Sequence, residues 1–359
     1  MKKYLFLAAL VGVAFTSCVR NEEFAPKTQK EISFEVANYV QSTRVGAFDT
    51  NEEFGAYAWV TDGGVTTQLM DEETVSYGTT SLDHDKNDAT PSLTSYWKTA
   101  TTYYWPLEGT VDFICYYPTT TVPTIDYKYE GNDTYKYTDY VVGTDDLMYA
   151  DKAVRYSSNV ANYNGFTGVP TLFRHALAKL NFKVQNGNYD DGVYYWRITV
   201  KKITASIYKK GSVTLQNEKT PANADQAVWS LPSNGVWTPT DPAALVEYEW
   251  DPASDVVLNN GDLTDFDAKT VYVLPQTLVA GKQTVTVSYT IDQIRKSDST
   301  VISSKDYTPT LNLYSNTLEH WKMNKNITYT LSFNPKGEMI LFAPAVEDWG
   351  TATGSVVVM

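Results

Sequence analysis

Histidine, cysteine and basic residues are all scarce in this chain of 359 residues, which has 3 His, 2 Cys and a formal net charge of -13. Two thiols cannot build a disulfide framework. His84, His175 and His320 lie far apart, and no G-x-S-x-G, P-loop or H-E-x-x-H motif is present. The negative charge argues against a nucleic-acid partner. The residues therefore predict no enzyme, no metal site and no cofactor.

Long apolar runs are also missing, apart from a short one at the start. Tyr4–Phe15 follows Lys2 and Lys3 and is too short to span a bilayer, so it is typical of a signal peptide. Small residues then lead directly to Cys18, as a lipoprotein signal peptidase requires. We expect Met1–Ser17 to be a removable leader and Cys18 to carry the lipid. The alternative is a plain secreted protein with a Cys at that place.

Aromatic residues, in contrast, are plentiful, with 27 Tyr and 9 Trp. These side chains favour strands, and short alternating segments recur along the chain with no convincing helix between them. The pattern predicts an all-β protein with two β-sandwiches that divide near residues 165–180. Residues 61–96 and 119–146 are predicted to be long loops. The clearest predicted strands are Ile32–Tyr39, Phe54–Val60, Val111–Pro118, Arg197–Ile207, Val271–Pro275, Thr284–Ile291, Ile327–Phe333 and Met339–Phe342.

The residue types that often act in catalysis or metal binding are expected to have structural roles in this chain. Cys115 stands between apolar residues of a predicted strand and is expected to be a buried thiol. His175 has apolar neighbours and is expected to be a hydrogen-bonded core histidine. Asp83–Asp88 begins like a calcium loop, but the required Gly and the closing Glu are absent. The aromatic side chains are expected to fill the sandwich cores, although exposed aromatic platforms would suit sugar binding.

Seven segments of the chain form a recognisable series. They are the lipoprotein leader, Ile32-Ser33-Phe34 with Thr43-Arg44, Phe54–Ala58, Trp105–Pro118, Phe173–Leu180, Val271–Leu278 and Val346–Trp349. Together they resemble the fimbrillin family, the subunits of type V pili of Bacteroidota. The resemblance implies two transthyretin-like β-sandwich domains in tandem. It also implies assembly by strand exchange after cleavage by an arginine-specific protease.

Arg44 is the natural cleavage site under this resemblance, because no other Arg lies between Arg20 and Arg155. Without the resemblance it would be an ordinary loop arginine. With a cut between Arg44 and Val45, the predicted organisation of the chain has four parts. These are a signal peptide (1–17), a propeptide tether with the first strand (18–44), an N-terminal sandwich (45–172) and a C-terminal sandwich with a donor tail (173–359).

Removal of residues 18–44 would take the first strand away and leave an apolar groove. Ile32, Phe34 and Val36 alternate with polar neighbours, and their burial contributes about 1.5–3 kcal/mol each. An empty groove of this kind accepts a replacement strand through main-chain hydrogen bonds and alternate side-chain pockets. The expected donor is the C-terminal tail of another copy, through either Ile340 and Phe342 or Val356 and Val358.

A groove and a donor at opposite ends of one chain make head-to-tail contacts that do not close. We therefore expect a structural pilus subunit of the stalk, since the chain has a donor tail. Its expected partners are other pilins, an arginine-specific protease and, before cleavage, the outer membrane through the lipid. The expected location is the outer membrane and then the cell-surface fimbrium. The alternative is a surface lipoprotein that binds glycans and never polymerises.

Overall fold

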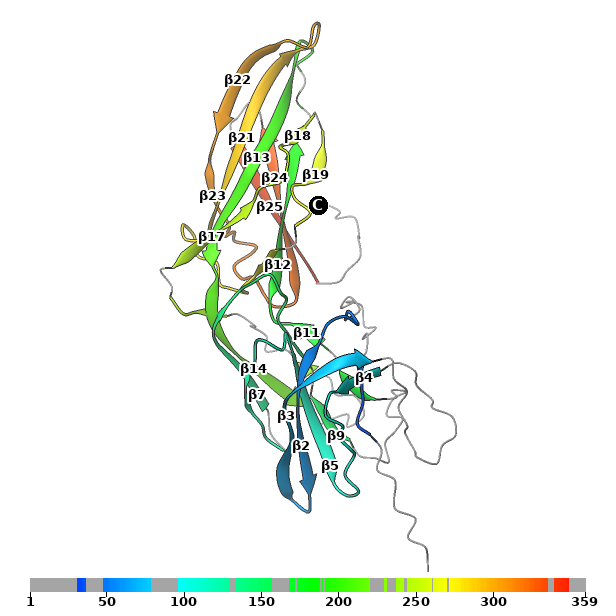
Figure 1. Ribbon diagram of the computed structural model, residues 1–359. Helices are drawn as coiled ribbons and strands as arrows, with labels where there is room; N and C mark the ends of the chain where they lie inside the picture. The colour runs from blue at the N-terminus through cyan, green and yellow to red at the C-terminus, as the bar shows by residue number, and fades with distance from the viewer. Residues whose placement is uncertain are drawn as a thin grey trace, which may run out of the picture.

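The computed structural model is built from β-strands alone in the part of the chain that it describes, so the predicted all-β class is confirmed. Within these residues no helix is long and apolar enough to cross a membrane. Figure 1 shows an elongated molecule in which two groups of strands follow one another along the long axis. The described residues are 31–36, 48–78, 96–129, 133–150, 152–156, 168–171, 173–187, 189, 191–219, 229–230, 237–241, 244–259, 261–269, 271–334 and 339–348.

The first strand group contains a nine-stranded sheet and a five-stranded sheet. The larger has the order β10-β1-β4-β3-β2-β5-β8-β11, with β9 also paired to β5, and the smaller has the order β15-β14-β7-β6, with β16 paired to β14. The larger sheet consists of β1 (Phe34–Val36), β2 (Phe54–Asp62), β3 (Val65–Gly78), β4 (Tyr96–Thr99), β5 (Thr110–Tyr117), β8 (Met148–Ala150), β9 (Ala153–Tyr156), β10 (Val169–Thr171) and β11 (Phe173–His175). The smaller consists of β6 (Thr124–Asp126), β7 (Asp133–Val141), β14 (Lys210–Lys219), β15 (Trp229–Ser230) and β16 (Thr238–Pro239).

The second strand group also contains two sheets. One has the order β19-β12-β24-β25 with β20 paired to β12, and the other has the order β17-β13-β21-β22 with β18 paired to β13 and β23 to β21. The first of these consists of β12 (Ala178–Asn186), β19 (Leu263–Asp265), β20 (Val271–Val273), β24 (Lys325–Asn334) and β25 (Met339–Asp348). The second consists of β13 (Tyr194–Tyr208), β17 (Leu245–Trp250), β18 (Val256–Leu258), β21 (Thr284–Arg295), β22 (Val301–Tyr307) and β23 (Thr310–Asn312).

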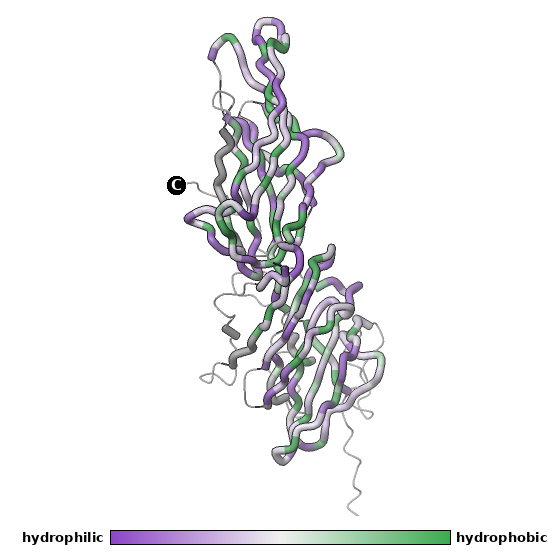
Figure 2. The backbone as a smooth tube through the Cα atoms, turned by 90° about the vertical axis from the view of Figure 1, so that its left-hand side faces the viewer, coloured by the Kyte–Doolittle hydropathy of each residue, from purple (hydrophilic) through white to green (hydrophobic). Residues whose placement is uncertain are grey.

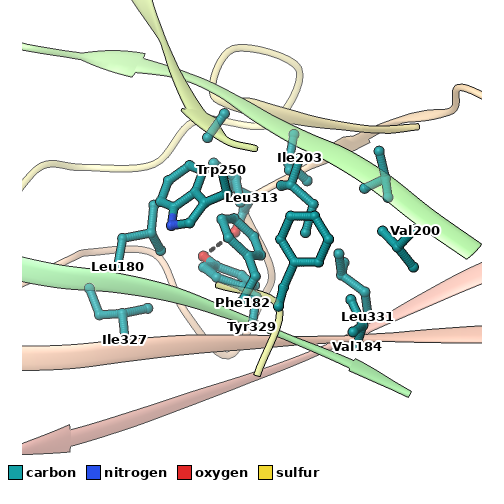
Figure 3. Close-up of a cluster of buried hydrophobic side chains, with 14 of the residues drawn as sticks. Leu180, Phe182, Val184, Val200, Ile203, Trp250, Leu313, Ile327, Tyr329 and Leu331 are labelled. Atoms are coloured by element: carbon teal, nitrogen blue, oxygen red, sulfur yellow. Dashed lines mark hydrogen bonds between the residues drawn. The ribbon is translucent and has the colours of Figure 1, made fainter. Parts of the chain in front are cut away.

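Alternation of apolar and polar residues explains the second group. Buried and half-buried side chains alternate along the whole of β12 and almost the whole of β21 and β24. Figure 2 shows hydrophobic and hydrophilic residues interspersed along the backbone of both strand groups. The buried faces form one core, in which Phe182, Trp250 and Leu331 pack together (Figure 3). The buried Tyr329 hydroxyl has a hydrogen-bond partner there, because it donates to the Leu313 carbonyl at 2.8 Å.

Strand β5 is buried on both faces, because the nine-stranded sheet lies between two apolar clusters. Phe113 and Cys115 belong to the cluster that also contains Phe34. Ile114 and Tyr116 belong to the other cluster, against the smaller sheet. A strand covered on both sides has an unbroken apolar sequence. The predicted burial of Cys115 is confirmed, and burial raises the pKa of its thiol.

Two further predictions from the sequence are confirmed, one for His175 and one for the aromatic side chains. His175 is buried, and its Nδ1 contacts the Asp146 carboxylate. The aromatic side chains largely fill the cores, since none of the seven tryptophans whose burial the structure describes is exposed. The buried ones are Trp97, Trp196, Trp237, Trp250 and Trp321, while Trp59 and Trp105 are half-buried.

The prediction of long loops at 61–96 and 119–146 was wrong for two segments. Strand β3 pairs with β2 through a hairpin closed by Gly63 and Gly64, which both have positive φ, as two-residue hairpin turns require. Its outward residues are polar, so the apolar alternation is weak. Strand β7 alternates through Tyr135 and Tyr137, which are buried despite their hydroxyl groups.

The chain returns from the second group to the first through a nearly continuous strand. Only Lys209 separates β13 from β14, and β14 pairs with β7 along most of its length. The buried Gln276 side chain accepts from the Tyr208 N–H at 3.3 Å and donates to the Tyr208 carbonyl at 3.4 Å. The Val142 N–H donates to the Lys209 carbonyl at 3.0 Å. Strand pairing therefore crosses the boundary predicted between residues 172 and 173.

Gly55 provides a direct check of the packing in the first group. A Cβ atom at this position would lie 2.1 Å from Cζ of the buried Tyr116 ring. We expect Gly55→Ala to lower the free energy of unfolding by about 1–3 kcal/mol, because the ring has to move within a packed cluster. Urea denaturation measures the change. Gly143→Ala is the control, since nothing lies closer than 4.0 Å there, and an equal loss in both variants would contradict the packing.

Candidate assembly site

Strand β1 lies inside the sheet and not at its edge. It pairs in parallel with β10, where Phe34 stands opposite Val169, and antiparallel with β4, where Phe34 stands opposite Trp97. The Ile32 N–H donates to the Tyr103 carbonyl at 2.8 Å, and the Val169 N–H donates to the Ser33 carbonyl at 2.8 Å. The strand is therefore held by its backbone on both sides.

The side chains predicted to fill the groove are buried to different degrees. Ile32 is 1% exposed and Phe34 is 2% exposed, whereas Val36 is half-buried. The Phe34 ring meets Phe54 and Phe113 edge-on, with centroids 5.8 and 5.6 Å apart. Edge-to-face packing of this kind adds to the apolar burial. Ile32 and Phe34 therefore anchor the strand, and Val36 contributes less.

Tyr103 supports the seat of the strand from the neighbouring segment. Its carbonyl accepts from Ile32, and its hydroxyl donates to Glu73 at 2.6 Å. The hydrogen bond to Glu73, together with burial, raises the pKa of Tyr103 to about 12. The hydroxyl therefore remains a donor at neutral pH and ties the segment that flanks β1 to β3. Nothing in the sequence pattern singled out Tyr103, because its partner lies thirty residues away.

Phe48 is a site residue that the sequence pattern did not single out. Its ring stacks on Phe173, with centroids 4.9 Å apart and an angle of 16° between the rings. It also meets Trp97 and Tyr117 edge-on. Phe48 is in the same apolar cluster as Ile32 and Phe34. The chain just after the predicted cut is thus fastened to the body, beside the seat of β1.

The C-terminal segment with Ile340 and Phe342 forms β25, the last strand in the order of its sheet. Its backbone pairs antiparallel with β24 from Met339 to Asp348, with Phe342 opposite Leu331. Pro344 within it fits an edge position, because proline offers no N–H to a further strand. In the single chain this segment is therefore a strand of its own sheet.

The remaining predicted site residues lie outside the described residues. They are Cys18, Arg44, Val45, Val356 and Val358. Lipidation and cleavage therefore stay predictions. Among the described residues, the structure places β1 in the first strand group and β25 in the second, so it does not bring the two predicted strands together.

Comparison with known proteins identifies the family. A family model described as fimbrillin-like matches residues 43–349. The chain belongs to the fimbrillin-like family. The resemblance drawn from its sequence segments is thereby confirmed. Strand β1 of this fimbrillin-like chain lies before the first matched residue.

Solved structures resemble the fimbrillin-like chain over most of its length. A fimbrial protein from Bacteroides vulgatus is 18% identical, with 89% of this chain and 99% of that chain aligned and a TM-score of 0.59. The tip fimbrial protein Mfa3 from Porphyromonas gingivalis, with a C-terminal truncation, is 9% identical over 89% of this chain and 98% of that chain, with a TM-score of 0.36. At 18% identity, the similarity to the Bacteroides vulgatus protein shows a shared fold and no more. No curated protein sequence matches the chain.

Substitution of the anchor residues tests the seat of β1. We expect Phe34→Ala to lower the free energy of unfolding by about 3–5 kcal/mol, because a fully buried ring is lost. Val36→Ala is the matched control on the same strand and is expected to cost only about 1 kcal/mol, since Val36 is half-buried. Urea denaturation of the uncut chain compares the two. Equal losses would show that β1 is not held by Phe34.

Proposed function

We propose that this fimbrillin-like chain is a structural pilus subunit of the stalk that polymerises by donor-strand exchange. The observation that carries the proposal is the position of β1. It is a short strand in the interior of a sheet, yet it lies at the N-terminal end of the described chain, next to the predicted cleavage site. A strand so placed leaves the body as one piece when the connection that follows it is cut.

Loss of β1 would expose apolar surface and main-chain groups at the same time. Ile32 and Phe34 contribute about 1.5–3 kcal/mol each through burial. Their partners Phe54, Phe113 and Trp97 would then face water. In addition, β10 and β4 would each lose a neighbouring strand. Unpaired strand edges around an apolar floor bind an extended segment strongly.

The connection after β1 is suited to this release. The cut proposed between Arg44 and Val45 lies between β1 and Phe48. Because Phe48 stacks on Phe173 and meets three other rings, the new N-terminal end stays on the body. Residues 18–44, including the lipid on Cys18, would depart with β1. The acyl chain would then deliver the precursor to the outer membrane without anchoring the mature subunit.

We assign the donor to the C-terminal tail of another copy. Strand β25 is an edge strand in one sheet and the last described element, so it can leave its own sheet by breaking one ladder, that with β24. Ile340 and Phe342 alternate in sequence as a groove-filling strand requires. Val356 and Val358 form the second candidate. Because the groove lies in the first strand group and β25 in the second, the contact is head-to-tail and extends into a filament.

The two strand groups fit this role as two transthyretin-like sandwich domains, one that carries the groove and one that carries the donor. We propose that residues 45–172 form the first, with β11, β14, β15 and β16 added from the following segment, and that the rest of 173–359 supplies the second. The mature location would be the cell-surface fimbrium. The half-buried and buried tryptophans offer no comparable support for the alternative of a glycan-binding lipoprotein.

Limited digestion of the purified precursor tests the cleavage step. An arginine-specific protease is expected to produce an SDS-resistant ladder of multimers, and N-terminal sequencing of the product is expected to begin at Val45. Arg44→Ala is expected to abolish the ladder. Arg295→Ala is the matched control, since Arg295 is a half-exposed arginine paired with Asp298, and it is expected to leave the ladder intact. Wild-type protein that is cut after Arg44 and remains monomeric would contradict strand exchange.

The donor assignment is tested in the same assay. Phe342→Asp is expected to shorten the ladder by at least tenfold in multimer yield, because a charge cannot enter an apolar groove without a partner. Val346→Asp is the control in the same strand, since Val346 is 45% exposed. If Phe342→Asp polymerises normally while a deletion of residues 350–359 does not, the donor is the second candidate, Val356 and Val358.

A further inference from the structure

Three charged side chains meet inside the first strand group, away from β1 and β25. Lys152 is 4% exposed, Asp112 is 2% exposed and Asp133 is fully buried. The Lys152 Nζ lies 3.2 Å from Oδ2 of Asp112 and 2.7 Å from Oδ2 of Asp133. One ammonium cannot neutralise two carboxylates, and buried charges are costly unless they are fully compensated. Stabilisation of the fold alone therefore does not account for this cluster.

The three residues come from different elements of two sheets. Asp112 belongs to β5 of the nine-stranded sheet, Asp133 begins β7 of the smaller sheet, and Lys152 directly precedes β9. Tyr127 covers the cluster, with its ring 4.4 Å from the Lys152 Nζ and its hydroxyl donating to Asp112 at 2.9 Å. Trp59 stacks on Tyr127 at 4.2 Å. Water is thus kept away by aromatic side chains.

The two oxygens of Asp133 have different surroundings. Oδ1 accepts a hydrogen bond of 2.5 Å from the Lys128 backbone N–H. Oδ2 lies against the Lys152 Nζ, and no other group among the described residues donates a hydrogen bond to Oδ2. Burial raises the pKa of Asp133, against the opposing effect of Lys152. The direction of this shift is toward the neutral acid, which is the form that an amine attacks at Cγ.

This arrangement contains the parts of an acyl transfer. An amine lies against a carboxyl group, a second carboxylate lies within reach of that amine, and a backbone N–H holds the oxygen on which negative charge would develop. We propose that the Lys152 Nζ and the Asp133 carboxyl group condense to an intramolecular amide, with Asp112 as the general base.

The atoms balance without any further reactant. Asp112 takes one proton from the Lys152 ammonium, and the freed electron pair of Nζ attacks Cγ of the neutral Asp133 acid. A second proton moves from Nζ to Oδ2, the Cγ–Oδ2 bond breaks, and one water molecule leaves. The third proton stays on the amide nitrogen, Oδ1 becomes the amide oxygen, and Asp112 ends as a neutral acid. The product carries no buried charge in the cluster.

The amide joins the start of β7 to the residue before β9, and therefore links the two sheets of the first strand group covalently. It does not depend on cleavage, on β1 or on the donor tail. Its presence and the proposed polymerisation are thus tested separately, because the amide is detected in the uncut chain.

Peptide mass spectrometry of the purified, denatured protein tests the proposal. Trypsin cuts an unmodified chain after Lys128, Lys136, Lys152 and Arg155. The amide blocks the cut at Lys152 and joins peptide 129–136 to peptide 137–155. The joined species is expected about 18 Da below the sum of the two peptides, because one water is lost. Separate peptides 129–136 and 137–152 from folded wild-type protein would overturn the proposal.

Variants assign the roles. Lys152→Arg and Asp133→Ala are expected to give no joined species, and Asp112→Asn is expected to reduce it at least tenfold. Lys128→Arg is the control, since its side chain is 55% exposed and only its backbone N–H is used, and the joined species is expected to persist. The wild-type measurement stands even if a variant fails to fold. Full linkage in Asp112→Asn would overturn its assignment as the base.

Discussion

The pairing of β1 on both of its sides is the constraint on which the rest of the first strand group depends. An edge strand can be lost with little effect on its sheet, whereas an interior strand connects what lies on its two sides. Among the described residues β10 pairs with no strand of the sheet other than β1, and Ile32, Phe34 and Val36 pack into the apolar cluster. Stability and the capacity to open therefore reside in one short segment, which explains why Ile32 and Phe34 are buried so completely.

The sequence was sufficient where burial on one face imposed a regular alternation. Strands β12, β21 and β24 are of this kind, and so was the first strand with Ile32 and Phe34. It was insufficient where the outward face is polar, as in β3, or where tyrosine supplies the apolar surface, as in β7. Gly63 and Gly64 did carry a hairpin signal between β2 and β3, but the threonines and acidic residues around them are equally common in loops.

Contacts between distant segments were beyond any local pattern. Phe48 is a site residue because its ring stacks on Phe173. Lys152 is part of a charged cluster because Asp112 and Asp133, from other strands, lie against it. Similarly, the return of β14 to pair with β7 could not be predicted, because alternation shows that a strand exists but does not name its neighbour. The position of β25 in its own sheet is a further example, since alternation in Ile340 and Phe342 suits an internal strand and a donated one equally.

The continuity of β13 and β14 has a mechanical consequence. These strands have 15 and 10 residues, so at about 3.3 Å per residue they form a nearly continuous extended path of roughly 80 Å, which changes direction as it passes from one strand group to the other (Figure 1). Near the junction of the two strands, the Gln276 side chain bonds to the Tyr208 backbone and the Val142 N–H donates to the Lys209 carbonyl. Bending at this point would strain both sets of hydrogen bonds. A load applied along the molecule acts on the flanking ladders in shear, so that many hydrogen bonds must fail together. The two strand groups are thus joined by paired backbone as well as by the covalent chain.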